Sequence, residues 1–133
     1  MSSQPSSLQQ TTPYEQIGGA AAVRQLVTDF YDRMESLPSA TQLRHMHAAD
    51  LNPVRETLYE FLCGWLGGPR TYFERPAAKC LMSVHAGFVI DQAAADQWLL
   101  CMRHALDKLD APQAARDFID AAFTRVCTAM VNR

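Results

Sequence analysis

The stretch from residue 79 to residue 102 carries side chains whose types and spacing suit ligand binding. It reads KCLMSVHAGFVIDQAAADQWLLCM and holds one histidine, His85, and one tryptophan, Trp98, thirteen residues later. A neutral imidazole and an indole that arrive from successive helices suit a metal-bearing planar cofactor held between helices. A lone histidine among apolar neighbours is also commonly a hydrogen-bonded core residue. Residue types alone leave both interpretations open.

Histidines and cysteines elsewhere give weaker signals for a metal site. His45 and His47 form an HxH pair, but zinc needs a third and a fourth ligand, so we favour surface or pocket histidines. The four cysteines form no CxxC pair, which favours buried, reduced thiols over a zinc cluster or disulfides. No CxxCH motif occurs, so a haem would be held without thioether bonds. The cysteines are Cys63, Cys80, Cys101 and Cys127.

The composition bounds the class of protein. The chain has 133 residues, 48% of them hydrophobic, which is enough for one domain with a core that could enclose a cofactor. Its 12 basic and 14 acidic residues are spread along the chain and give a net charge of -2. Because no basic stripe is available to meet phosphates, nucleic acid is not an expected partner.

Residues 1–13 (MSSQPSSLQQTTP) differ in composition from the rest. They are rich in Ser, Gln, Thr and Pro, which predicts a disordered N-terminal tail and leaves 14–133 as one domain. The tail has neither the basic region nor the apolar run of a signal peptide, and no later apolar stretch is long enough to cross a bilayer. We therefore expect a cytoplasmic protein without a membrane partner.

Apolar residues recur at spacings of three and four, which predicts an all-α fold of antiparallel helices with short connections. The glycines at 18–19 and the Gly-Gly-Pro at 67–69 are expected to break the chain. Tyr31 lies on the border of an apolar stripe, with its ring in the core and its hydroxyl in need of a partner. The predicted helices cover 14–17, 20–35, 52–66 and 91–109, with a last helix after Pro112, while 36–49 and 70–78 are short or irregular.

Two helix starts and one helix face are predicted in more detail. Asn52 is the expected N-cap of its helix, with Pro53 at the first helical position. Asp91 is the expected N-cap of the helix that carries Trp98. The inner face of the last helix is expected to comprise Ile119, Ala122, Val126, Ala129 and Met130.

Six motifs occur in order and cover essentially everything after the tail. They are YEQIGG (14–19), FYDRM (30–34), LRHMH (43–47), LYEFLCGWLGGP (58–69), HAGF (85–88) and DQWLLCM (96–102). Together, at these spacings, they resemble the group II truncated haemoglobins. The glycine pairs and the tryptophan thirteen residues after the histidine are the specific parts of the likeness.

The resemblance implies a globin-like, two-over-two sandwich of helices that holds haem b, with His85 as the proximal iron ligand. Tyr31 and Trp98 match the distal tyrosine and tryptophan of the family, and His47 matches a polar or aromatic pocket residue. Val54 falls where many globins carry a distal histidine, which this pocket would lack. The resemblance further implies that Leu58, Phe61, Leu62, Leu81 and Phe88 line the haem plane and that Tyr72 points toward a propionate.

The chain departs from the family pattern near the haem propionates. Val84 stands where an arginine commonly meets a propionate, and Thr57 stands where a basic residue is frequent. Lys79, Arg75 and Arg55 are the candidate substitutes. The apolar face of the haem should still supply most of the binding free energy, because exposed ion pairs contribute only ~0–1 kcal/mol each.

The implied pocket points to retention of a bound diatomic ligand (O2, NO or CO) at a five-coordinate iron. Tyr31, His47 and Trp98 could each donate a hydrogen bond to a ligand that takes up negative charge. Slow oxygen release favours redox chemistry, such as nitric oxide detoxification or reaction with peroxide, over simple oxygen transport. Such chemistry needs a reductase that the chain does not encode. The alternative is a haem-poor helical sensor or interaction module, and a homodimer is left open.

Overall fold

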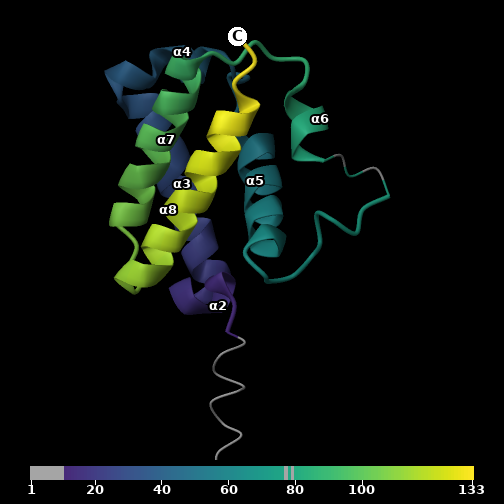
Figure 1. Cartoon of the computed structure of the whole chain (residues 1–133), viewed down its shortest axis with the longest axis vertical. Helices are drawn as coiled ribbons and strands as arrows, with labels where there is room; N and C mark the ends of the chain where they lie inside the picture. The colour runs from purple at the N-terminus through teal and green to yellow at the C-terminus, as the bar shows by residue number, and fades with distance from the viewer. Residues whose placement is uncertain (1–10, 77, 79) are drawn as a thin grey trace, which may run out of the picture.

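The computed structural model describes residues 11–76, 78 and 80–133, and these residues form helices and connecting segments without a strand. The predicted all-α class is thereby confirmed. None of the helices in these ranges is long and apolar enough to span a bilayer. The elements are α2 (Pro13–Ile17), α3 (Gly19–Ser36), η1 (Pro38–Ala40), α4 (Thr41–His45), α5 (Asn52–Trp65), α6 (Leu81–His85), α7 (Gln92–Asp107) and α8 (Gln113–Met130), shown in Figure 1.

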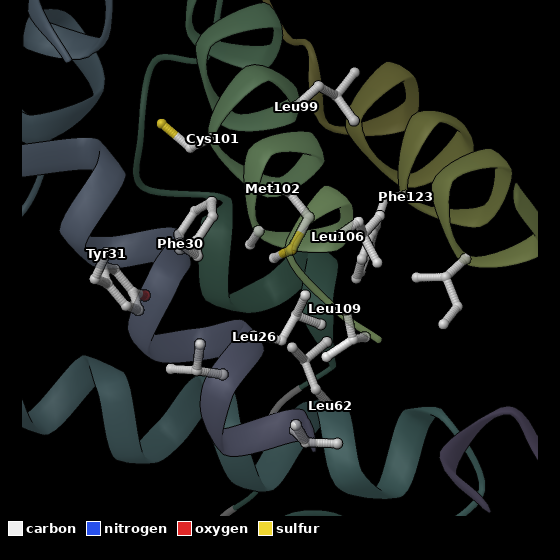
Figure 2. Packing of buried hydrophobic residues seen from close by; sticks show 14 of the residues in the cluster. Leu26, Phe30, Tyr31, Leu62, Leu99, Cys101, Met102, Leu106, Leu109 and Phe123 are labelled. Carbon is white, nitrogen blue, oxygen red and sulfur yellow. The ribbon is translucent and has the colours of Figure 1, made fainter. Parts of the chain in front are cut away.

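Four long helices form two packed pairs. Helix α3 packs against α5 and α7, and α7 packs against α8, so that α7 and α8 lie over α3 and α5 (Figure 1). The apolar stripe predicted on α3 is buried between the pairs, where Phe30 and Leu26 meet Met102 and Leu106 of α7 (Figure 2). Each such side chain contributes about 1.5–3 kcal/mol when it leaves water. This body is the two-over-two arrangement that the resemblance implies.

The first turn of helix begins earlier than expected. Residues 1–10 of the predicted tail lie outside the described residues, but Thr12 and Pro13 belong to the start of α2. The Thr12 hydroxyl accepts a hydrogen bond from the Glu15 backbone N–H (3.2 Å), and the Glu15 carboxylate accepts one from the Thr12 N–H (3.2 Å). This reciprocal capping box satisfies two N–H groups that a helix end leaves free.

Glycines 67 and 68 let α2 dock against the end of α5. The backbone N–H of Tyr14 donates to the Leu66 carbonyl (2.9 Å), and the Tyr14 ring lies against Gly68. A Cβ on Gly68 would stand 2.6 Å from that ring, and Gly67 adopts a φ of 100° that other residues avoid. The Gly-Gly pair therefore permits both the end of α5 and the close approach of α2.

The expected helix caps are half right. Asp91 caps α7, because its carboxylate accepts the Ala94 backbone N–H at 2.8 Å. Asn52 is not a cap: it is the first residue of α5, and the Asp50 carboxylate accepts its backbone N–H at 3.0 Å. The Asp50 side chain, two residues earlier, accepts this hydrogen bond because the turn before α5 folds back on the helix start.

The inner face of α8 also differs from the prediction. Ile119 is fully buried as expected, but Ala129 is exposed, and Phe123 and Cys127 are buried instead. A spacing of four from Ile119 through Phe123 to Cys127 keeps these side chains on one face, which turns toward α5 and α7. Val126 and Met130, which the prediction also named, are partly buried, so the prediction was wrong at Ala129 and missed Phe123 and Cys127.

Candidate functional site

A cavity of about 320 Å³ lies between the four-helix body and the short helix α6. Helices α3, α4, α5, α7 and α8 contribute side chains to it, and α6 contributes Val84 and His85. In Figure 1, α6 stands apart on the right, beyond α5, while α3, α4 and α7 lie on the left. The cavity therefore has two unlike walls, one from the packed body and one from α6 and the segment that follows it.

The α6 wall carries the imidazole of His85. This residue is the last of α6, is partly exposed, and lies 6.4 Å from Phe88 between ring centroids. Val84 and Phe88 line the same cavity although they are 41% and 45% exposed. In the described part of the chain, no three His, Cys, Asp or Glu side chains converge to hold a metal ion by themselves. A metal at His85 would therefore need its other ligands from a cofactor.

Asn132, close to the C-terminus, holds the segment that follows His85. Its backbone N–H donates to the Ile90 carbonyl, its Oδ1 accepts the Ile90 N–H, and its Nδ2 donates to the Phe88 carbonyl, each at 2.8 Å. These three bonds join positions more than 40 residues apart. The sequence reasoning missed Asn132, because a single asparagine near a chain end carries no local signal.

Tyr31 of α3 is the most deeply buried polar group of the opposite wall. It is 3% exposed, its ring meets Phe30 edge-on at 4.8 Å, and it lines the cavity. Among the described residues, its hydroxyl makes no hydrogen bond. Burial raises the pKa of this phenol, against a weaker opposite effect of the Arg55 guanidinium. The hydroxyl therefore stays protonated and needs a partner in the cavity.

His47 lies beside Tyr31, with 6.0 Å between ring centroids. Its Nδ1 lies 2.9 Å from the Leu43 carbonyl oxygen, and since that oxygen can only accept, Nδ1 carries the proton. Burial lowers the pKa of the His47 imidazole; the Leu43 hydrogen bond raises it, and Arg44 and His85 lower it. The neutral ring then has a bare Nε2, which is an acceptor. The sequence analysis had treated His47 as a donor.

Trp98 completes the polar side of this wall. The half-buried indole packs at 5.0 Å from Phe30 and 5.2 Å from Phe123, and it lines the cavity. An indole N–H only donates. Trp98 and Tyr31 are thus two donors on the wall that faces α6, which the resemblance had implied.

A chain of hydrogen bonds sets the position of His47 relative to Trp98. The Gln97 Oε1, next to Trp98 on α7, accepts the Leu43 backbone N–H at 2.9 Å. The carbonyl of the same Leu43 accepts a hydrogen bond from Nδ1–H of His47. Gln42 donates to the Asp91 cap at 3.0 Å and accepts from Gln97 at 3.2 Å. Helices α4 and α7 are therefore held together at the cavity, which no sequence motif had indicated.

The predicted haem contacts on α5 and the following loop do gather around the cavity. Leu58, Phe61 and Leu62 line it, and Tyr72 meets the Phe61 ring edge-on at 5.4 Å. The side chain of Leu81 lies outside the described residues. Val54 lines the cavity too, so no distal histidine is supplied from α5. Other side chains that line the cavity, none of them predicted as haem contacts, are Leu43, Met46, Trp65, Ile90, Ala94, Ala95, Phe123, Val126, Cys127 and Met130.

The candidate substitutes for the missing propionate arginine are engaged elsewhere where they are described. Arg75 pairs with Glu60, and Arg55 pairs with Asp32 at 3.3 Å and Glu35 at 3.9 Å. Lys79 lies outside the described residues. No arginine or lysine of the described part lines the cavity, and the Thr57 hydroxyl donates to the Pro53 carbonyl at 3.1 Å.

These observations fit a flat, apolar group that brings its own metal. The Tyr31 side chain lines the cavity and its hydroxyl makes no hydrogen bond among the described residues, so a ligand in the cavity could accept one from it. Val84 and Phe88 present apolar surface that a planar ring system would cover. His85 would supply one nitrogen to such a metal, from the wall opposite Tyr31 and Trp98.

Comparisons with known proteins agree with this geometry. A family model described as bacterial-like globin matches residues 12–132. The chain is 34% identical over 121 residues to a group 2 truncated hemoglobin of Bacillus subtilis, with 91% of this chain and 89% of that relative covered. The cold-adapted truncated hemoglobin of Pseudoalteromonas haloplanktis superposes with a TM-score of 0.88 at 35% identity, over 92% of this chain and 99% of that one. The group II 2-on-2 hemoglobin of Agrobacterium tumefaciens gives 0.87 at 39% identity, over 92% and 95%.

Proposed function

Because the chain belongs to the bacterial-like globins and is a group II truncated haemoglobin that binds haem b and small gaseous ligands, we propose a specific division of the cavity. His85 is the one protein ligand of a five-coordinate iron, and Tyr31 and Trp98 act on the ligand across from it. The haem supplies the redox-active iron. The chain supplies the imidazole, the apolar enclosure and the hydrogen-bond donors.

The observation that carries this proposal is the unpaired hydroxyl of Tyr31. The Tyr31 side chain lines the cavity in the wall that faces α6, beside the Trp98 donor, and no described group accepts a hydrogen bond from its hydroxyl. Hydrogen bonds to groups that carry charge contribute about 1.5–3 kcal/mol each. Two of them on a ligand that takes up negative charge slow its release on the order of 10²-fold or more.

Slow release suits a protein that keeps its ligand for redox chemistry better than one that must unload it. We therefore place the activity in reactions of bound oxygen with nitric oxide, or of the iron with peroxide, rather than in oxygen transport. Such turnover requires an electron donor, which is an external reductase. The apolar enclosure from Leu58, Phe61 and Leu62 limits access of water to the reacting ligand.

The alternative, a haem-poor module, depends on how tightly the protein holds its haem. Where the chain is described, no lysine or arginine lines the cavity, and Val84 leaves the propionate side without a guanidinium. This favours a haem that is held mainly by apolar contact and by His85. We expect faster haem transfer to an acceptor globin from this protein than from its Val84→Arg variant.

Absorption spectra of the ferric, ferrous and carbon-monoxide forms test the proposal. The protein expressed with adequate haem should show a Soret band, and His85→Ala should abolish the normal ferrous and carbon-monoxide spectra. His45→Ala is the matched control, because His45 is exposed and does not line the cavity. A purified protein that takes up no haem, or a His85→Ala variant with unaltered spectra, would rule the assignment out.

A further inference from the structure

The three polar side chains on the wall that faces α6 are Tyr31, His47 and Trp98, and they are not equivalent in their hydrogen bonding. Tyr31 and Trp98 present protons to the cavity, whereas the neutral His47 presents a lone pair at Nε2. Among the described residues, Nε2 meets no hydrogen-bond partner. A wall with two donors and one acceptor matches a ligand that itself carries a proton.

Dioxygen and hydrogen peroxide differ in this respect. Dioxygen can only accept hydrogen bonds, so Tyr31 and Trp98 satisfy it and the lone pair of His47 does not help. Hydrogen peroxide carries a proton on each oxygen and also accepts, so it can use the donors and the acceptor together. The tautomer of His47 therefore discriminates between the two ligands.

We propose that Nε2 of His47 accepts a proton from hydrogen peroxide bound in the cavity. This proposal rests on the proposed haem site. Hydrogen peroxide gives one proton to Nε2, which leaves the hydroperoxide anion and an imidazolium that carries protons on both nitrogens. No electron moves in this step. Tyr31 and Trp98 would donate hydrogen bonds to this anion, and the haem, where bound, would supply the ferric iron that takes it up.

Two features hold the ring in the state that this role requires. The Leu43 carbonyl accepts a hydrogen bond from the Nδ1–H group at 2.9 Å and so fixes both the tautomer and the orientation of the ring. The Leu43 backbone N–H is held in turn by Gln97, beside Trp98. Burial lowers the pKa of the ring and outweighs the opposite effect of the Leu43 hydrogen bond, and the Arg44 guanidinium lowers it further, so the ring is neutral before it meets the peroxide.

Stopped-flow mixing of the ferric, haem-loaded protein with hydrogen peroxide at pH 7 tests the proposal. His47→Gln should slow the bimolecular reaction on the order of 10²-fold, which is the usual contribution of a positioned base. Oxygen release from the same variant should not become faster, because the lone pair that is lost does not retain oxygen. His45→Gln, two residues away and exposed, should leave both rates unchanged.

Nitrogen-15 NMR of the diamagnetic ferrous carbon-monoxide form of the wild type gives a readout without any variant. It should find the proton of His47 on Nδ1 and none on Nε2. A proton on Nε2, a peroxide rate in His47→Gln close to that of the wild type, or faster oxygen release by tenfold would each overturn the proposal. A normal Soret band in these samples separates that failure from a failure of the haem assignment.

Discussion

The two walls of the cavity are built in opposite ways. The wall from α3, α4 and α7 belongs to the main core, where Tyr31 is 3% exposed and Phe30 is fully buried (Figure 2). The other wall consists of the five-residue helix α6, which has no side-chain N-cap, and the following segment, where Phe88 is 45% and Val89 58% exposed. One wall is closely packed without a ligand, although the Tyr31 hydroxyl has no partner there, and the other wall leaves apolar surface exposed.

This difference indicates where selectivity and where haem binding reside. The donors and the acceptor that act on the ligand are held by core packing, so they are preorganised before a ligand arrives. The α6 wall gains apolar contact only when a planar group covers it, so its stability is linked to haem binding. Asn132 limits how far this wall can open, because it holds both Phe88 and Ile90.

The largest expected effect contrasts one phenylalanine from each wall. Phe30→Ala should lower the free energy of unfolding by about 3–5 kcal/mol, because it removes a fully buried ring that supports Tyr31 and Trp98. Phe88→Ala should change the stability of the haem-free protein by less than about 0.5 kcal/mol but speed haem loss. Urea unfolding and haem transfer to an acceptor globin measure these quantities. Equal costs in unfolding would break the comparison.

The donors should control ligand release and not haem binding. Tyr31→Phe and Trp98→Phe should each speed oxygen dissociation on the order of 10- to 100-fold, since a hydrogen bond to a charged group is worth about 1.5–3 kcal/mol. Tyr59→Phe is the control, because Tyr59 lies under the Arg24 guanidinium and does not line the cavity. Unchanged off-rates in both variants would remove these residues from the ligand.

Loss of the Asn132 side chain should loosen only the α6 wall. Asn132→Ala removes two hydrogen bonds, at roughly 1 kcal/mol each. The free energy of local opening at Ile90 should fall by about the sum of the two, so its amide should exchange faster. Exchange in the middle of α3 should not change. Asn52→Ala, at an exposed helix start, is the matched control. Equal acceleration in both walls would mean that Asn132 supports the whole fold.

The smallest effect concerns pH. Burial lowers the pKa of His47, so below about pH 6.5 the unfolded chain takes up a proton that the folded ring resists. Folding is therefore destabilised as the pH falls from that value to the lowered pKa, and the contribution is constant above and below this window. As the pH falls through this window, the Tm of the wild type should fall relative to the Tm of His47→Gln. A difference independent of pH would show that the ring titrates alike in both states.

Much of the fold was predictable because its signals are local. Periodic apolar residues marked α3, α5 and α7, the glycines at 18–19 and 67–68 marked the breaks, and Asp91 marked a cap. The buried face of α8 was the exception, because the local pattern does not show whether Ala129 or Phe123 is buried. Only packing against the other helices decides this. The candidate site residues were named through a resemblance that uses several motifs at once, and those the structure describes line one cavity.

By itself, the sequence determined the helices, their breaks and the types of side chain available to the cavity. The tertiary structure decided what those side chains do: the Leu43 carbonyl makes His47 an acceptor, Gln97 ties it to α7, and Asn132 secures the segment after His85. Helix propensity and capping depend on neighbours within a few positions, which a sequence displays directly. A tautomer or a tie across more than 40 positions depends on atoms that meet only after the helices have packed.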